Sequence, residues 1–323
     1  MSGLALRVGF TCLTLAQFDE AAFFPSTRYS SSLPPAIESD SRERPLKRNR
    51  PCKTYRGATH CGMEWDEWIM VDALVRPRHT VIEFGGRFGT TSCRLARATA
   101  NSGAVAVVEP DSSVHKTLLH NRDAHRCNFH VVGGTVSDTV LSVATSTAKS
   151  AYSTAAVRLP KKGGRRSKRH KAMVEVPNFD FREIEKRVGS IFNVALIDCE
   201  GCIKHIAATG ILDQVHLILL EADSTKVVNY EKWYRHLLNR GFANVWMSQD
   251  TLDLALAADG ATGPGAVHEF SRATQHSAWV RLSSDEGRRG PLEDKCLEHK
   301  RRLNYRPHEL TCLPLKGNNT RVH

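Results

Sequence analysis

The stretch TVIEFGGRFGTT, residues 80–91, decides the fold that this sequence predicts. A short β-branched run passes through a glycine-rich turn, and a helical pattern opens directly behind the turn over residues 90–100. Glycines at such a turn let the backbone approach a ligand closely. In an open α/β sheet, ligands bind outside the carboxyl ends of the strands, at the point where the strand order reverses. The sequence therefore predicts a ligand site beside Gly85.

Short apolar runs bounded by Gly, Asp or Pro recur along the chain and alternate with helical patterns. Asp111 is a candidate cap of one helix, and residues 230–238 follow the spacing of another helix, which ends before Gly241. Continuous apolar runs are typical of strands buried on both faces of a parallel sheet. Together they predict an α/β fold with a doubly wound, seven-stranded, mostly parallel sheet. The predicted strands are residues 80–84, 104–109, 129–132, 193–198, 215–221, 242–247 and 277–282.

Composition supports one folded domain with extensions. The chain has 323 residues, of which 41% are hydrophobic and 24% charged, and this balance excludes wholesale disorder. Residues 25–56 are rich in Ser, Pro and Arg with few apolar residues, so residues 1–58 are predicted to be a mostly disordered leader. The alternating strand and helix patterns define a domain at residues 59–283, which contains an insertion at 140–176. A basic tail follows at 284–323. A helix with one aromatic face is expected to open the domain near Met63 and to end at Pro77.

The net charge of +11 is concentrated in part in KKGGRRSKRHK, residues 161–171. This segment is interpreted either as a solvated loop or as a nuclear-localisation or phosphate-contacting patch. No aromatic residues interleave it, so base stacking on nucleic acid has no support here.

The nine cysteines follow no framework spacing, which favours reduced thiols and an intracellular compartment. The cytoplasm is favoured, and a nuclear or organellar location stays open. Cys199-x-x-Cys202 lacks a second pair at ligand spacing, so no metal site is expected and packing is the preferred interpretation. The apolar stretch from Leu4 to Ala16 is too short to span a bilayer, so no membrane span is expected.

Two carboxylates indicate the kind of ligand. Glu83 belongs to a Glu-x-Gly-x-x-x-Gly turn, and Glu109 ends the next strand, where it can accept both hydroxyls of a ribose. A carboxylate at the turn would repel a pyrophosphate but suits a ligand that carries an ammonium and a sulfonium group. The predicted cofactor is S-adenosylmethionine.

Four motifs resemble those of class I S-adenosylmethionine-dependent methyltransferases, and in particular the FkbM-like family. They are VIEFGGRFGTT, VVEPDSSVHKTLLHN, VVGGTVSD and LIDCEGCIKHI, within residues 80–225. The resemblance implies a seven-stranded sheet with the last strand antiparallel, S-adenosylmethionine as methyl donor and a hydroxyl acceptor. It also implies a cofactor site in which four turn residues hold the methionine end, Glu109 holds the ribose and Asp198 faces the sulfonium. The four turn residues are Glu83, Gly85, Gly86 and Gly89.

The expected activity is O-methylation of a hydroxyl on a small molecule or sugar. Asp198 and Glu200 are the candidates for a catalytic base because both follow a strand's carboxyl end, although Glu200 has the alternative role of capping a helix at residues 201–208. The sequence departs from the family pattern at Leu196, where the family has lysine, and at Ile203 and Arg87. These departures bear on catalysis more than on cofactor binding.

Two other functions stay open. One is a protein that keeps the fold without the activity and serves as a binding or scaffold module through the basic insertion. The other is a nucleic-acid methyltransferase that uses the same insertion.

Overall fold

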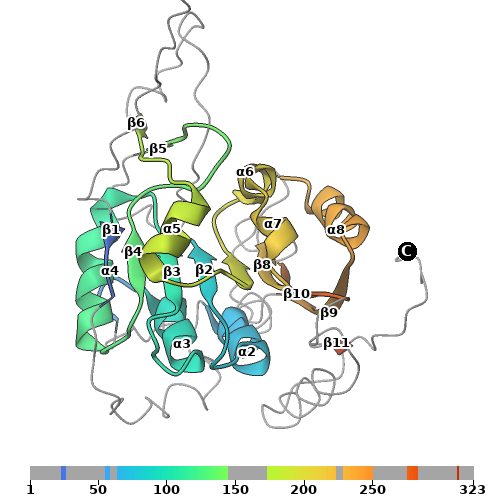
Figure 1. The fold of residues 1–323 in the computed structure, drawn as a ribbon, viewed down its shortest axis with the longest axis horizontal. Coiled ribbons are helices and arrows are strands. Elements are labelled where there is room, and N and C mark those ends of the chain that lie inside the picture. The colour runs from blue at the N-terminus through green and yellow to red at the C-terminus, as the bar shows by residue number, and fades with distance from the viewer. Residues whose placement is uncertain are drawn as a thin grey trace, which may run out of the picture.

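The computed structural model describes residues 23–26, 55–58, 64–144, 173–222, 228–249, 275–282 and 311–312, which form an open sheet with helices on both faces (Figure 1). Each of the seven predicted strands is present, with bounds that differ by a few residues from the sequence prediction. These strands are β2 (Val81–Phe84), β3 (Val105–Val108), β4 (His130–Val132), β7 (Val194–Ile197), β8 (Leu217–Ala222), β9 (Phe242–Gln249) and β10 (Gln275–Arg281).

The strand order confirms the predicted fold class. From β4 the order runs β4-β3-β2-β7-β8-β10-β9, and neighbours from β4 through β8 are parallel. Strand β10 is antiparallel to both β8 and β9, as the resemblance implied. The chain moves outward from β2 to β4 and then returns to β7 on the other side of β2. The strand order therefore reverses between β2 and β7.

Two short edge strands raise the number in the described sheet from the predicted seven to nine. Strand β1 (Phe23–Phe24) pairs antiparallel with β4, and β11 (Thr311–Cys312) pairs antiparallel with β9. They come from the segments predicted as leader and tail, and two-residue strands are too short to show a periodic pattern. The remainder of both segments lies outside the described residues, except residues 25–26 and 55–58.

The predicted insertion begins and ends in a small sheet of its own. Strands β5 (Ser142–Ala144) and β6 (Met173–Glu175) pair antiparallel at its base. The basic segment 161–171 lies outside the described residues, so its predicted roles stay predictions.

Helices cover both faces of the sheet (Figure 1). The first face carries α2 (Trp65–Leu74), α3 (Thr90–Ala98) and α4 (Ser112–Ala124), all three of which the sequence predicted. The second face carries α5, α6, α7 and α8. The sequence predicted α8 directly and named a helix at residues 201–208, where α6 lies, whereas α5 and α7 were not predicted. The helices of the second face are α5 (Phe181–Val188), α6 (Ile203–Ile206) with the 3₁₀ turn η3 (Ala207–Thr209), α7 (Ile211–Gln214) and α8 (Tyr230–Asn239). Among the described helices, none is long and apolar enough to cross a membrane.

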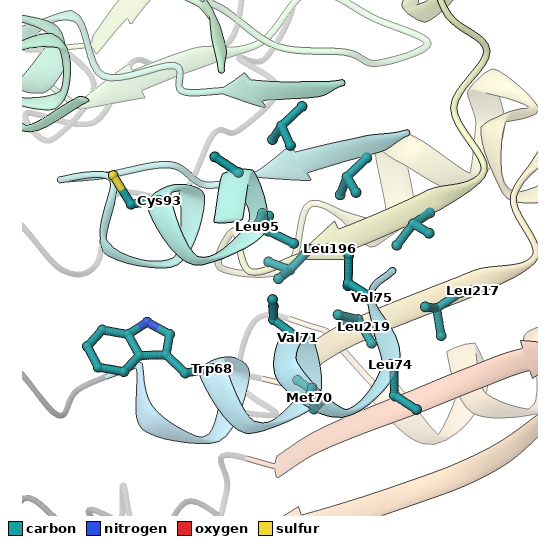
Figure 2. Packing of buried hydrophobic residues seen from close by; sticks show 14 of the residues in the cluster. Trp68, Met70, Val71, Leu74, Val75, Cys93, Leu95, Leu196, Leu217 and Leu219 are labelled. Carbon is teal, nitrogen blue, oxygen red and sulfur yellow. The ribbon is translucent and has the colours of Figure 1, made fainter. Parts of the chain in front are cut away.

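The strands at the centre are buried on both faces, as their continuous apolar runs predicted. Alternate residues of each strand point to opposite faces, so Leu196 packs beneath α2 and α3 while Ile197 belongs to the second core. Figure 2 shows Leu196 among Val71, Leu95 and Leu219. Burying each such side chain contributes on the order of 1.5–3 kcal/mol, and the two cores fix the sheet between its helix layers.

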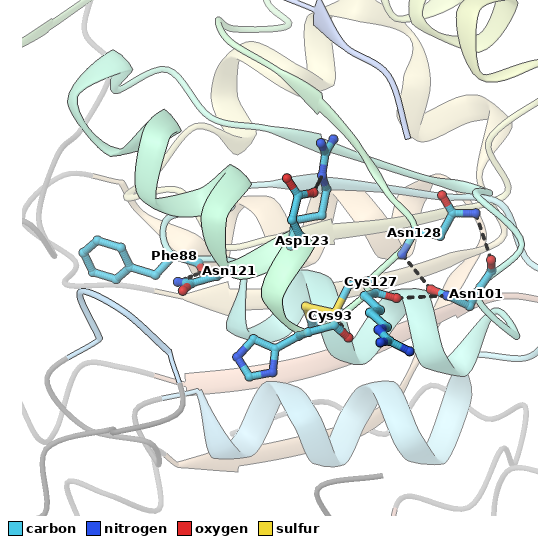
Figure 3. Close-up of a disulfide and its surroundings, with 10 residues drawn as sticks. Phe88, Cys93, Asn101, Asn121, Asp123, Cys127 and Asn128 are labelled. Carbon is cyan, nitrogen blue, oxygen red and sulfur yellow. Dashed lines mark hydrogen bonds and ion pairs between the residues drawn. A yellow bond between two sulfur atoms is a disulfide. The ribbon is translucent and has the colours of Figure 1, made fainter. Parts of the chain in front are cut away.

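Four cysteines form disulfides, so the prediction of reduced thiols is wrong for these four. Cys93 of α3 is bonded to Cys127, which precedes β4 (Figure 3), and Cys199 is bonded to Cys202. The Cα atoms of Cys93 and Cys127 lie 5.2 Å apart although 34 positions separate them in the chain. Packing of α3 against the segment before β4 creates this proximity, which sequence spacing does not reveal. The inference of an intracellular compartment loses its basis in the thiols.

Replacing Cys93 and Cys127 together by Ala should lower the free energy of unfolding by about 3–4 kcal/mol, because the bridge closes a long loop in the unfolded chain. Urea denaturation without reductant measures the effect. The matched control is the double variant Cys199→Ala/Cys202→Ala, whose bridge closes a very short loop. A loss at Cys93/Cys127 no larger than that of the control would contradict the expectation.

Candidate functional site

A pocket lies at the carboxyl ends of β4, β3, β2 and β7. This is the edge at which the strand order reverses, so the structure supports the position that the sequence predicted. Its apolar wall consists of Phe84, Val108, Pro110, Val136, Leu141 and Ile206. Its polar side chains are Glu64, Arg87, Glu109, Thr135, Asp198 and Glu200.

Gly85 allows the ends of β2 and β7 to meet. Its φ is +99°, and a Cβ atom at this position would lie 1.6 Å from the carbonyl oxygen of Asp198. Gly86 is also packed closely, since its Cβ would lie 2.1 Å from Cγ1 of Val107. Gly89 begins α3 with a φ of +79°. Of the predicted glycines, Gly85 lines the pocket, whereas Gly86 and Gly89 shape the turn behind it.

Glu109 joins the end of β3 to the glycine turn. Its Oε2 accepts a hydrogen bond of 2.8 Å from the backbone N–H of Arg87, and its Oε1 accepts one of 2.7 Å from the N–H of Asp111. Burial raises the pKa of Glu109 to about 7, against the lowering effect of these two bonds and of the Arg87 charge. Each carboxylate oxygen has a further lone pair. Glu109 can therefore still accept hydrogen bonds from hydroxyl groups of a ligand in the pocket, which it lines.

Asp198 and Glu200 both line the pocket directly after β7. The backbone N–H of Asp198 donates to the carbonyl oxygen of Phe84 at 2.9 Å, which continues the pairing of β7 with β2. Glu200 has a φ of +54°, and the Cys199–Cys202 disulfide closes the turn around it. The alternative role of Glu200 as a helix cap is wrong, because α6 has Cys202 at its N-cap position.

Glu83, the first predicted cofactor residue, lies behind the turn and is not part of the pocket wall. It is 1% exposed, and its Oε2 has no hydrogen-bond partner among the described residues. Burial raises its pKa well above the usual range, and the charges of Glu64 and Asp198 raise it further. In the strand register Glu83 lies opposite Leu196. The lysine of the family pattern would therefore lie next to this carboxyl group, and here the position is apolar.

Sequence reasoning missed Glu64, which lies immediately before α2. Its Oε2 is in hydrogen-bond contact with the hydroxyl of Thr90 and lies 2.8 Å from the hydroxyl of Thr91. Burial and the charge of Asp198 raise the pKa of Glu64, against the lowering effect of the threonine hydroxyls. A signal was present in the sequence, since Glu64-x-x-Glu67 opens an apolar helix near the glycine turn.

The loop after β4 also reaches the pocket. Gly134, Thr135 and Val136 belong to the VVGGTVSD motif, and all three line the pocket wall. Asn178 holds this loop, since its Oδ1 accepts from the N–H of Ser137 at 3.0 Å and its Nδ2 donates to the Ser137 carbonyl at 2.9 Å. The motif thus supplies a wall of the pocket, a role that the sequence analysis did not assign to its residues.

Carboxyl groups are the most numerous polar groups of the site. Burial raises the pKa of Glu67 well above its usual range, and the nearby charges of Asp198 and Glu64 add to this effect. Four carboxyl groups, Glu64, Glu109, Asp198 and Glu200, line the pocket together with Arg87. Glu67 and Glu83 lie close behind the wall. An arrangement of this kind favours a positively charged ligand that also carries an apolar part.

Neither a protein-family model nor a curated protein matches the sequence. Solved structures with a similar chain path include an O-methyltransferase from Bacillus cereus in complex with SAH. It is 9% identical, covers 78% of this chain and 92% of its own, and has a TM-score of 0.37. Another is precorrin-6y C5,15-methyltransferase from Geobacter metallireducens, with 9% identity, 74% and 98% coverage and a TM-score of 0.37. Likenesses at this level carry no conclusion about the ligand.

Replacing Gly85 by Ala should destabilise the protein by several kcal/mol, because the new Cβ would collide with a backbone oxygen that cannot move without separating β2 from β7. The matched control is Gly210→Ala, since Gly210 has a φ of +86° with no atom within 4 Å of a Cβ. The control should lose only about 1–2 kcal/mol from backbone strain. Urea denaturation compares the two variants, and equal losses would disprove the close approach.

Proposed function

We propose that this chain is an S-adenosylmethionine-dependent methyltransferase. The observation that carries the proposal is the concentration of carboxyl groups around a partly apolar pocket at the reversal point of a parallel sheet. Glu109 and Asp198 lie there at the ends of β3 and β7, the two strands that flank β2, and Gly85 directly follows β2. S-adenosylmethionine carries an adenine, a ribose, an ammonium, a sulfonium and a carboxylate, and these walls complement the first four of these groups.

The residues present fit this cofactor. We assign Glu109 to the ribose hydroxyls, because each of its oxygens keeps a lone pair beyond the bonds to Arg87 and Asp111. Val108, Val136 and Leu141 offer an apolar surface for the adenine. Glu64 and Asp198 supply negative charge for the ammonium and the sulfonium groups. Glu83 lies behind the turn, outside the pocket wall, and is assigned no contact with the cofactor.

When bound, S-adenosylmethionine would supply a methyl group on a positively charged sulfur, and the carbon–sulfur bond breaks as an in-line nucleophile bonds to the methyl carbon. The chain then mainly has to hold the nucleophile, the methyl group and the sulfur in one line, and such positioning contributes several kcal/mol to lowering the barrier. The apolar wall excludes water from the reacting groups. We propose a hydroxyl acceptor on a small molecule or sugar, with Asp198 or Glu200 as the group that takes its proton.

The affinity for S-adenosylmethionine should be about tenfold weaker at pH 6 than at pH 8. The pKa of Glu109 is about 7, so its carboxylate form, which accepts the ribose hydroxyls, is largely lost at pH 6 and restored as the pH rises through 7. Arg87 and Asp111 are the charged groups facing it. Isothermal titration calorimetry at several pH values measures the profile.

The Glu109→Gln variant should bind S-adenosylmethionine about 10–100-fold more weakly at pH 8, because it loses charge-assisted hydrogen bonds. Its affinity should also change less with pH than that of the wild type. Glu231→Gln, an exposed change on α8, is the control and should behave like wild type. Wild-type protein that binds no S-adenosylmethionine at pH 8 would refute the proposal and leave the binding or scaffold function. An unchanged Glu109→Gln profile would refute the role of this residue alone.

Asp198→Asn and Glu200→Gln should separate binding from chemistry. Asp198→Asn should weaken cofactor binding, because it removes charge beside the sulfonium, whereas Glu200→Gln should leave cofactor binding within about threefold and lower turnover by about 10²-fold or more. Binding calorimetry and methyl transfer to a panel of hydroxyl compounds measure the two effects. A Glu200→Gln variant with full turnover would exclude Glu200 as the base.

A further inference from the structure

Three side chains far apart in the sequence converge next to the pocket. They are Glu67 in the first turn of α2, Glu221 near the end of β8 and His276 near the start of β10. One potential ligand atom from each lies within 4.8 Å of the other two. Nε2 of His276 is 3.6 Å from Oε1 of Glu221 and 3.9 Å from Oε1 of Glu67.

The fold holds these side chains rigidly on one face. His276 and Glu221 are direct partners in the antiparallel register of β8 and β10, and residues directly opposite in such a pair project to the same side. Their strand neighbours Leu219 and Ala278 belong to the core beneath α2, so this side faces that helix. Helix α2 contacts both strands and brings Glu67 over the pair. Sites built on helices and strands are more precise than sites built on loops.

Burial distinguishes this cluster from a surface group of charges. His276 and Glu67 are each 2% exposed, and the Glu221 side chain is 18% exposed. The imidazole presents Nε2 to both carboxylates at distances longer than a hydrogen bond. Its Nδ1 has no hydrogen-bond partner within the described part of the chain. A buried and a partly buried carboxylate at this separation repel each other unless a positive charge lies between them.

We propose that Glu67, Glu221 and His276 bind a divalent transition-metal ion, for which Zn²⁺ and Mn²⁺ are the best-matched ions. Ligand atoms about 2.1 Å from a tetrahedral ion are about 3.4 Å from one another, close to the observed spacings. Imidazole nitrogen suits zinc and carboxylate oxygen suits manganese, so a mixed set accepts either. Three protein ligands leave at least one coordination position for water or another oxygen.

This metal site would adjoin the pocket. The hydroxyl of Thr91 lies 2.8 Å from Oε2 of Glu67 and 2.8 Å from Oε2 of Glu64, and Glu64 lines the pocket. Because one hydroxyl has one proton, it donates to only one of these carboxylates at a time. An ion bound by Glu67 would therefore influence the pocket through Thr91 and Glu64. The inference does not depend on the identity of the cofactor.

The test is metal binding by the full chain after removal of metals with a chelator. Free Mn²⁺ is counted by electron paramagnetic resonance, because manganese binds thiols weakly, and retained Zn²⁺ is then measured by mass spectrometry after gel filtration. The wild-type chain should bind one Mn²⁺. Glu67→Gln, Glu221→Gln and His276→Gln should each weaken that binding at least tenfold, with near-ultraviolet circular dichroism to show that they fold.

His130→Gln is the matched control, since His130 is a buried histidine bonded to Gly103 and Ser26 and remote from the cluster in the strand order. It should keep wild-type affinity. A wild-type chain that binds neither Mn²⁺ nor Zn²⁺ at millimolar concentration would overturn the proposal, whatever the variants do. Wild-type affinity in the three folded variants would also overturn it. In either case the three side chains would form a structural polar cluster that holds no metal ion.

Discussion

The close approach of the backbone at Gly85 and Asp198 is the constraint on which the candidate site depends. The absence of a Cβ at Gly85 lets the carbonyl of Asp198 occupy the space, and the Asp198 N–H donates to Phe84. These contacts join β2 and β7 at the position where the strand order reverses. Without them the acidic turn after β7 and the glycine turn after β2 would not border one pocket.

Ionising the buried carboxyl groups of this site lowers the free energy of unfolding. Burial raises the pKa of Glu83 and Glu67, and the mutual repulsion of these groups with Glu64 and Asp198 adds to the cost of ionising them. Glu109 offsets part of its own cost through two backbone N–H donors. A positively charged ligand or metal ion would relieve the remaining repulsion, so binding and folding stability are coupled here. Functional sites commonly carry such a cost.

The centre of the fold could be predicted from the sequence because continuous apolar runs mark strands that are buried on both faces. Helix α5 was missed although Asp180 caps it and Gly189 ends it, since its apolar residues are few. The Cys93–Cys127 disulfide and the Glu67–Glu221–His276 cluster had no local signal. Their geometry follows from strand register and helix packing, which bring distant residues together only in the folded chain. Glu109 and Asp198 could be predicted because each ends a recognisable strand.

The departure at Leu196 affects the region behind the pocket more than the pocket itself. Leu196 is 1% exposed and packs in the core beneath α2 and α3, opposite Glu83 in the register. A lysine there could neutralise Glu83, whereas leucine offers no charge to this buried carboxyl group, whose protonated form is favoured by burial and by the nearby carboxylates. A neutral Glu83 removes one negative charge near the glycine turn. Glu109, Asp198 and Glu64 still line the pocket, so the groups that we assign to the cofactor do not require the missing lysine.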